Sequence, residues 1–328
     1  MTSVLEKPVS GRDYPRNWGQ FLDWFADEQS CQQYLEHLRW PQGFFCPRCG
    51  ELNEPFRLTR NRLMCRACRY QSTVTAGTVF EKTRTPLRTW FAAAWYVTNQ
   101  KNGVSALGLQ RVLGLGSYQT SWAIMHRLRR AMVRPDRDLL HGIVEVDETF
   151  IGGPQRGTRR GRAIAARRQH EVKDDQFKAV VMIGIEMHQP KGFGRVRLRQ
   201  VADKTKQSLL SFVCEEIEPG STVHTDGSLS YITLTDHGYQ HYRSVQLGSE
   251  EPAHIAMPGV HRVASLLKRW LLGTHQGSVQ SHQLDYYLDE FTFRFNRRSS
   301  RSRGLLFYRL LEQAVITKPV TYRDIAGK

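Results

Sequence analysis

The sequence predicts an α/β protein whose main domain is a mixed β-sheet with flanking helices, preceded by a small zinc ribbon and a helical segment. Three observations support this fold class. Two close pairs of cysteines lie between residues 46 and 68, and amphipathic helical patterns fill residues 81–135. Beyond residue 140, three consecutive strand patterns are followed by alternating helices and strands, which is typical of a mixed sheet.

The composition indicates a globular protein with an anionic partner. The chain has 328 residues, of which 40% are hydrophobic, and a formal net charge of +16. This excess favours nucleic acid as the partner, and an acidic membrane surface is the second candidate. No run reaches the roughly 18 to 20 apolar residues of a membrane span, and the N-terminus lacks the apolar segment of a signal peptide. We therefore expect a cytoplasmic protein with reduced cysteines and no membrane partner.

Residues 1–40 are predicted to form an N-terminal helical segment. Apolar residues recur at near helical spacing from Trp18 to Leu38, and Asp27 marks a break and a cap between two short helices. Cys31 has no cysteine or histidine partner at ligand spacing, so we interpret it as a small core residue.

Cys46, Cys49, Cys65 and Cys68 form the pattern C-x2-C-x15-C-x2-C, which is typical of a four-thiolate zinc site. A closed shell of four thiolates leaves no open position, so this zinc is predicted to be structural within a ribbon at residues 41–80. The alternative is four unrelated buried cysteines. The basic neighbours favour a DNA contact, with a solvated basic face as the alternative. They are Arg48, Arg57, Arg60, Arg62, Arg66 and Arg69.

Residues 81–135 are predicted to be a helix-turn-helix-like DNA-binding segment. One helix is expected after Pro86, a second after a Ser105 cap, and a third from Tyr118, with a glycine-containing turn at 114–116 between the last two. This arrangement resembles a helix-turn-helix, although any helical hairpin gives a similar pattern. The polar side chains of the third helix that we expect to read DNA are Gln119, Thr120, Ser121, His126, Arg127, Arg129 and Arg130.

Two aspartates mark the candidate catalytic site in residues 140–312. Asp147 lies inside an apolar strand, and Asp226 ends a second strand just before the turn residues Gly227 and Ser228. A buried strand excludes a carboxylate unless its charge is compensated, and a metal ion is the usual partner. Two such carboxylates brought together by a sheet are a minimal site for divalent metal and phosphoryl chemistry.

Neighbouring groups allow more than one interpretation. Glu145 shares the face of Asp147 by the two-residue period and is either a supporting group or a solvated strand end, whereas Glu148 is expected on the opposite face. His224 is interpreted as a hydrogen-bonded core residue rather than a ligand. The arginine-rich insert at 155–170 follows the first strand, where a phosphate backbone would pass; the alternative is a solvated arm.

Several motifs recur together in this chain: the zinc ribbon, the helical segment, the strands VEVDETFIGG and HTDG, and the C-terminal runs LKRWLLGTHQG and YLDEFTFRFNRR. Together they resemble the zinc-ribbon insertion-sequence transposases of the DDE type, over about residues 15 to 312. The resemblance implies an RNase H-like (retroviral integrase) fold for residues 140–312 and leaves 313–328 as a tail. It also implies that Asp147 and Asp226 are the first two metal-binding carboxylates, with Mg²⁺ or Mn²⁺ as the catalytic ion. The partners would be double-stranded DNA at the element ends and target, bound by a homo-oligomer in a synaptic complex near the nucleoid.

The third acidic residue of the family is replaced here. The resemblance places an acid on a later helix, with a Lys or Arg seven residues beyond it, and the matching positions hold His261 and Lys268. Histidine is a poorer ligand than carboxylate for Mg²⁺ and suits Mn²⁺ better, but it can serve as a ligand or proton shuttle. The alternatives are a structural histidine or an inactivating replacement. The fallback third acids are Glu250, Glu251 and Glu290.

The predicted function is that of an insertion-sequence transposase, which binds terminal inverted repeats and carries out metal-dependent strand cleavage and strand transfer. Asp147, Asp226, His261 and Lys268 are the predicted catalytic residues. One alternative is a catalytically inactive, transposase-derived DNA-binding regulator. Another is an RNase H-like nuclease that cuts without joining.

Overall fold

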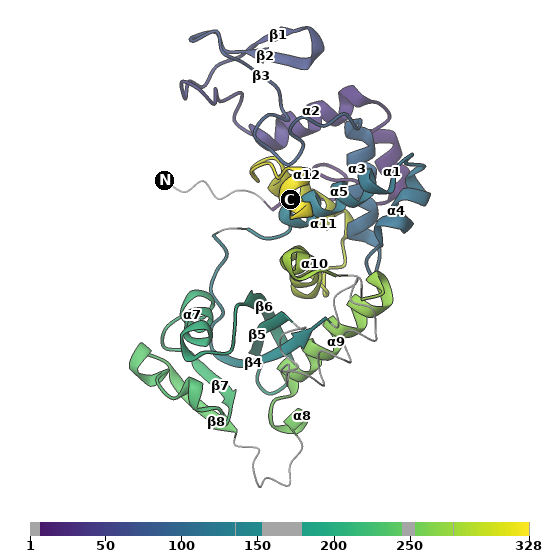
Figure 1. Cartoon of the computed structure of the whole chain (residues 1–328). Coiled ribbons are helices and arrows are strands. Elements are labelled where there is room, and N and C mark those ends of the chain that lie inside the picture. The colour runs from purple at the N-terminus through teal and green to yellow at the C-terminus, as the bar shows by residue number, and fades with distance from the viewer. Residues whose placement is uncertain (1–6, 135, 153–178, 245–252, 278, 328) are drawn as a thin grey trace. The chain divides into compact units, whose positions relative to one another are not determined.

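The computed structural model describes residues 7–134, 136–152, 179–244, 253–277 and 279–327, which form two compact units (Figure 1). The first unit combines the chain up to Arg134 with the segment from Ser299 onward. The second unit extends from residue 136 to Arg298. The arginine-rich insert at 155–170, together with Glu250 and Glu251, lies outside the described residues.

The first unit begins with two short helices whose boundary is set by capping. They are α1 (Trp18–Trp24) and α2 (Glu28–Arg39). The Asp27 carboxylate accepts the backbone N–H of Ser30 at 2.8 Å, and the Ser30 hydroxyl accepts that of Asp27 at 3.3 Å. This reciprocal capping box confirms the predicted break at Asp27. Cys31 is fully buried in α2, as expected of a core residue.

The ribbon is a small antiparallel sheet in the order β1-β2-β3. Its strands are β1 (Phe56–Leu58), β2 (Arg62–Met64) and β3 (Gln71–Ser72). Leu63 of β2 pairs with Arg57 on one side and with Ser72 on the other. The buried core of the ribbon consists of Phe44, Cys46, Leu63 and Cys65, so half of it is cysteine. Such a small core cannot hold the chain by apolar burial alone.

Three helices follow the ribbon: α3 (Leu87–Asn99), α4 (Ala106–Leu113) and α5 (Tyr118–Arg130). The Ser105 hydroxyl accepts the Gly108 N–H at 3.0 Å and caps α4, as predicted. Gly114 ends α4 at φ +62°, which glycine adopts without strain.

Three of the side chains expected to read DNA are instead inside the unit. Ser121 and His126 are 0% exposed and Arg129 is 2% exposed. The reason is that α5 packs against α3, α4 and α12 (Tyr322–Ala326), so the inward side of the helix also takes up polar side chains. Gln119 and Arg130 remain exposed, and Thr120 and Arg127 are half-buried.

A late helix completes the first unit. Helix α11 (Arg303–Ala314) packs on α3, and its fully buried Phe307 lies edge-on to Phe21, Phe91 and Trp95 at centroid distances of 5.6, 5.8 and 5.4 Å. The sequence-based division extended the catalytic domain to residue 312. The structure instead groups α11 with the first unit, because its apolar face completes this aromatic core.

The second unit contains a five-stranded sheet in the order β6-β5-β4-β7-β8. Strands β4, β5 and β6 pair antiparallel, while β7 pairs parallel with β4 and with β8. The central strand β4 therefore separates the antiparallel half of the sheet from the parallel half. The strands are β4 (Ile143–Ile151), β5 (Ala179–Met187), β6 (Phe193–Val201), β7 (Thr222–Asp226) and β8 (Gln240–Ser244).

Helices cover both faces of this sheet, as Figure 1 shows for α7 and α9. Helix α7 (Lys206–Glu216) packs on one face, where Val144, Val146 and Val223 are buried. Helices α9 (Pro258–His275) and α10 (Leu284–Asn296) pack on the other face, against Ile183 and Ile185. The short helix α8 (Ala253–Ala256) precedes α9. The predicted RNase H-like mixed sheet with flanking helices is confirmed.

Two 3₁₀ turns lie between β7 and β8. They are η3 (Leu229–Tyr231) and η4 (Thr235–His237). Tyr231 at the end of η3 and Leu234 just before η4 are the buried apolar side chains there.

Gly304 tests the packing of α11. A Cβ at this position would lie 1.9 Å from the Pro15 carbonyl oxygen, whereas a Cβ at Gly273 of α9 meets nothing within 4 Å. We expect Gly304→Ala to destabilise the first unit by about 1–3 kcal/mol, because the backbone must move. The matched change Gly273→Ala should stabilise α9 by up to about 1 kcal/mol. Urea denaturation of both variants measures this; a stable Gly304→Ala protein would contradict the packing described.

Candidate active site and zinc site

Asp147 and Asp226 lie on neighbouring parallel strands at the centre of the second unit. The register pairs Val144 with Val223 and Glu145 with His224, and two residues further along the same strands come Asp147 and Asp226. Residues two apart in a strand share a face, and adjacent strands are about 4.8 Å apart. Both carboxylates therefore extend from the same face, one strand apart.

Their proximity also affects their protonation. Burial raises the pKa of Asp147 to about 7, and the negative charges of Glu148 and Asp226 contribute in the same direction. Each aspartate keeps a local hydrogen bond: Asp147 Oδ1 accepts the Glu148 N–H at 2.8 Å, and Asp226 Oδ1 accepts the Ser228 N–H at 3.0 Å. A bound cation would offset the repulsion between these carboxylates, so the donor set fits a divalent metal.

Glu148 is a candidate site residue that the sequence analysis did not select. Its carboxylate accepts a hydrogen bond from the Tyr231 hydroxyl at 3.5 Å, and Lys204 Nζ lies 3.8 Å away. Burial and the charge of Asp226 raise its pKa. The two-residue period assigns Glu148 to the opposite face of β4. Glu148 nevertheless follows Asp147 directly and lies close enough to Asp226, the last residue of β7, for its charge to act on both aspartates. The available signal was the consecutive Asp147-Glu148 pair.

Glu145 fixes the start of α9. This carboxylate is 2% exposed, and its Oε2 accepts the backbone N–H groups of Gly259 at 2.7 Å and Val260 at 3.0 Å. A negative charge at a helix N-terminus is favourable because the first N–H groups have no partners within the helix. A Cβ at Gly259 would lie 2.7 Å from Met187 Sδ, so glycine permits this close approach. Glu145 is thus a buried supporting group and not a solvated strand end.

His261 lies in the first turn of α9, directly after Val260, and is partly buried. Lys268 follows two turns later on the same helix and is exposed. Across the described ranges, the cysteines are the one group of three or more potential metal-binding side chains with closely placed ligand atoms, so His261 does not form such a cluster with the aspartates here. Its role as third ligand stays a prediction.

The other side chains considered at this site have protein partners. His224 Nε2 lies 2.7 Å from the Ser244 hydroxyl, as expected of a hydrogen-bonded residue. Glu290 is 0% exposed, and its carboxylate pairs with Arg294 at 2.7 Å. Removing Glu290 from this pair to bind a metal would break a buried ion pair, which argues against it as the third acid.

The four cysteines form a compact site in the ribbon. All their sulfur atoms lie within 4.8 Å of one another, and the pairs Cys46–Cys68 and Cys49–Cys65 are each 3.7 Å apart. A tetrahedral ion with Zn–S bonds of about 2.3 Å requires sulfurs about 3.8 Å apart. Hydrogen bonds from the Cys68 N–H and the Asn53 amide lower the pKa of Cys65 to about 6, which favours the thiolate that binds metal. The site fits one zinc ion.

Several ribbon arginines lie against aromatic rings. Arg66 and Arg69 lie over Phe56 at 4.7 and 5.4 Å, and Arg48 lies over Tyr70 at 5.9 Å. Arg57 differs, because it pairs with Glu36 of α2 at 2.9 Å and its charge is offset within the protein.

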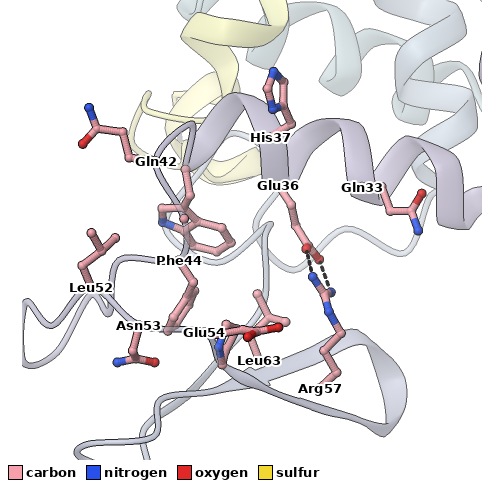
Figure 2. A pocket seen from close by; sticks show the side chains of 13 residues that line it. Gln33, Glu36, His37, Gln42, Phe44, Leu52, Asn53, Glu54, Arg57 and Leu63 are labelled. Atoms are coloured by element: carbon pink, nitrogen blue, oxygen red, sulfur yellow. Dashed lines mark hydrogen bonds and ion pairs between the residues drawn. The ribbon is translucent and has the colours of Figure 1, made fainter.

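A pocket of about 690 Å³ lies between α2 and the ribbon (Figure 2). Figure 2 shows the ion pair between Glu36 and Arg57 along its side, with Glu54 on the ribbon nearby. Two carboxylates in the lining make this pocket unfavourable for a DNA phosphate.

The two regions that carry these sites match known protein families. Residues 26–71 match the transposase zinc-ribbon domain, and residues 139–296 match the ISXO2-like transposase domain. This chain belongs to the zinc-ribbon insertion-sequence transposases of the DDE type. The transposase is also 26% identical over 283 residues to an uncharacterized protein in transposable element ISH50 of Halobacterium salinarum, a match that covers 82% of this chain and 91% of the relative. Within the described ranges, no helix has the length and apolar character needed to cross a membrane.

The zinc site predicts a metal content. Elemental analysis of the purified transposase should give one zinc per chain, and Cys65→Ser should lose it, because three thiolates hold the ion far less tightly. Cys214→Ser is the matched control, since Cys214 is exposed and distant from the ribbon sequence. Full zinc retention by Cys65→Ser would disprove the four-thiolate site.

The raised pKa of Asp147 predicts how stability depends on pH. Its pKa in the folded protein, about 7, lies above the ordinary value of 3.8, so folding is favoured by the protonated form. In magnesium-free buffer, the second unit should be most stable below about pH 4 with respect to this group and should lose that stability as the pH rises to 7. Asp147→Asn should reduce this dependence. Hydrogen-exchange mass spectrometry of β4 peptides measures it; an identical pH profile in the variant would contradict the assignment.

Proposed function

We propose that this transposase binds the terminal inverted repeats of its insertion sequence and carries out metal-dependent DNA strand cleavage and strand transfer. The observation that carries this proposal is the placement of Asp147 and Asp226 on adjacent parallel strands, facing the same side of the sheet. The membership of a transposase family supports the nucleic-acid substrate. The net charge of +16 agrees with a polyanionic partner.

In the proposed mechanism, Asp147 and Asp226 hold Mg²⁺ or Mn²⁺, with His261 as the third ligand. Divalent ions at such a site supply activation of a water or a DNA 3′-hydroxyl and stabilisation of the leaving oxygen. Glu145 positions His261 by holding the first turn of α9 against β4. Lys268, exposed two turns further along α9, would contact the DNA backbone.

The first unit is the proposed DNA-locating part. The zinc ribbon and the helices α4 and α5 would recognise the element ends, with the exposed part of α5 in the major groove. Because two ends must be joined to one target, we expect a homo-oligomer in the synaptic complex, within the cytoplasm and associated with the nucleoid. The finer division of the first unit into residues 1–40, 41–80 and 81–135 belongs to this proposal.

The histidine at position 261 favours one competing function. A catalytically inactive, transposase-derived regulator would keep the ribbon and the helices while losing the third acid. The relevant comparison is His261→Ala against His261→Glu in Mg²⁺ and in Mn²⁺. If His261 is a ligand, the alanine variant loses activity, and the glutamate variant retains or gains activity with Mg²⁺.

The decisive experiment uses labelled duplex carrying the element end. We expect Asp147→Asn and Asp226→Asn each to reduce nicking in Mg²⁺ or Mn²⁺ below detection, while gel-shift affinity stays near that of the wild type, because both lose the metal-binding charge. Asp236→Asn is the matched control, since Asp236 is exposed on η4. A cutting variant at either site residue would refute the assignment. Wild-type binding without nicking indicates the regulator, and nicking without joining indicates a nuclease.

A further inference from the structure

We infer that a basic pocket at the start of α5 binds a phosphate group of the DNA backbone. The pocket has a volume of about 270 Å³ and lies between the segment 82–85 and the first turns of α5. Three cationic side chains line it: Lys82, Arg84 and Arg127. This inference rests on the proposed DNA-binding function and assigns part of that binding to one site.

The pocket carries more positive than negative charge, because three cationic side chains line it and one carboxylate, that of Glu81, lies close to Lys82. Arg127 Nε is buried and has no hydrogen-bond partner among the described residues, and burial lowers the pKa of its guanidinium. Lys82 Nζ is 3.6 Å from Glu81, a carboxylate whose charge also acts on Arg127. Arg84 is exposed, and no ion pair of Arg84 occurs in the described part of the chain. A phosphate would supply the missing acceptor for Arg127 and the missing charge.

The segment that carries two of these cations is held in place. Thr83 Oγ1 accepts hydrogen bonds from Trp90 Nε1 at 2.9 Å and from the Thr85 N–H at 3.1 Å. Trp90 is itself buried at the start of α3. Because these bonds hold Thr83, the backbone that carries Lys82 and Arg84 needs little further ordering to bind an anion.

The start of α5 adds donors on the other side of the pocket. Gln119 and Thr120, in the first turn of α5, line the pocket. The N-cap residue Ser117 makes no side-chain cap, because its hydroxyl bonds to the Gln119 side chain at 2.8 Å. The first N–H groups of a helix lack partners within the helix and attract anions. They therefore reinforce the three cations.

The location of the pocket identifies the source of the phosphate. The first residues of the second helix in a helix-turn-helix contact base edges, so the flanking backbone passes beside that helix end. A pocket of this size accommodates a phosphodiester group but not a folded partner. Free phosphate offers the same chemistry and is distinguished by competition.

The test uses the full-length transposase and a fluorescein-labelled duplex of about 30 base pairs, with the binding constant measured over a range of NaCl concentrations. We expect Arg84→Gln to weaken binding roughly tenfold at low salt and to reduce the slope of log K against log salt by about 1. Arg84 is exposed, so its loss should leave the fold intact; circular dichroism checks this. Arg127→Gln should behave in the same way.

The matched control is Lys101→Gln. Lys101 is an exposed cation just beyond the far end of α3, a 13-residue helix that at 1.5 Å per residue is about 20 Å long. Lys101→Gln removes one positive charge, as Arg84→Gln does, but leaves the pocket unchanged. The slope of log K against log salt for Lys101→Gln should therefore equal that of the wild type.

The outcomes separate the two levels of the proposal. If the wild type does not bind DNA, the proposed function itself fails. If it binds and Arg84→Gln has the same slope as Lys101→Gln, the pocket is not a DNA site and only this inference fails. Replacing chloride by inorganic phosphate at equal ionic strength should weaken wild-type binding more than that of Arg84→Gln. If free phosphate binds at Arg84 but Arg84→Gln binds DNA as the wild type does, the pocket is a site for small anions and the inference is overturned.

Discussion

The parallel pairing of β4 with β7 is the constraint on which the candidate active site depends. The two strands are far apart in sequence, and nothing local brings their carboxylates together. Their hydrogen-bonded register places Asp147 beside Asp226, and the surrounding core keeps both partly out of water. The arrangement is electrostatically unfavourable in the protein alone, and a cation bound between the two carboxylates would relieve that repulsion.

In the first unit, the main constraint is the small core of the ribbon. Its three strands bury few apolar side chains, and two of the four core residues are zinc-binding cysteines. We therefore expect folding of the ribbon to depend on metal binding. The helical part of the same unit has its own core, in which Phe307 from α11 joins aromatic residues of α1 and α3.

The sequence predicted the features that depend on local patterns. The caps at Asp27 and Ser105, the strands around Asp147 and Asp226 and the cysteine ribbon follow from short-range signals, and the structure contains each of them. The features that it missed depend on contacts between distant segments. Phe307 could not be assigned to the first unit by periodicity. Helical spacing predicts which face of a helix is buried, but it does not predict which other helices cover that face.

The same limit applies to polar residues. His126 and Arg129 lie on a basic helix and gave no signal of burial, because burial of α5 depends on α3, α4 and α12 together. Glu145 could be placed on the correct strand face, but its binding to the start of α9 involves a residue more than a hundred positions away. Likewise, the charge interaction between Glu148 and Asp226 depends on where β7 ends beside β4. The two-residue period of a strand predicts which face a side chain takes, but it does not predict this distance.

The contact between Glu145 and Gly259 has a consequence for how this transposase can diversify. The helix start is pinned to β4, and there is no space for a larger residue at that point. Each residue of an α-helix advances the direction of the side chains by about 100° around the axis. One inserted residue after Val260 would therefore turn every later side chain of α9 to a different bearing. A substitution on α9 changes one side chain and leaves the bearings of the others as they are, whereas an insertion in its first turn changes them all.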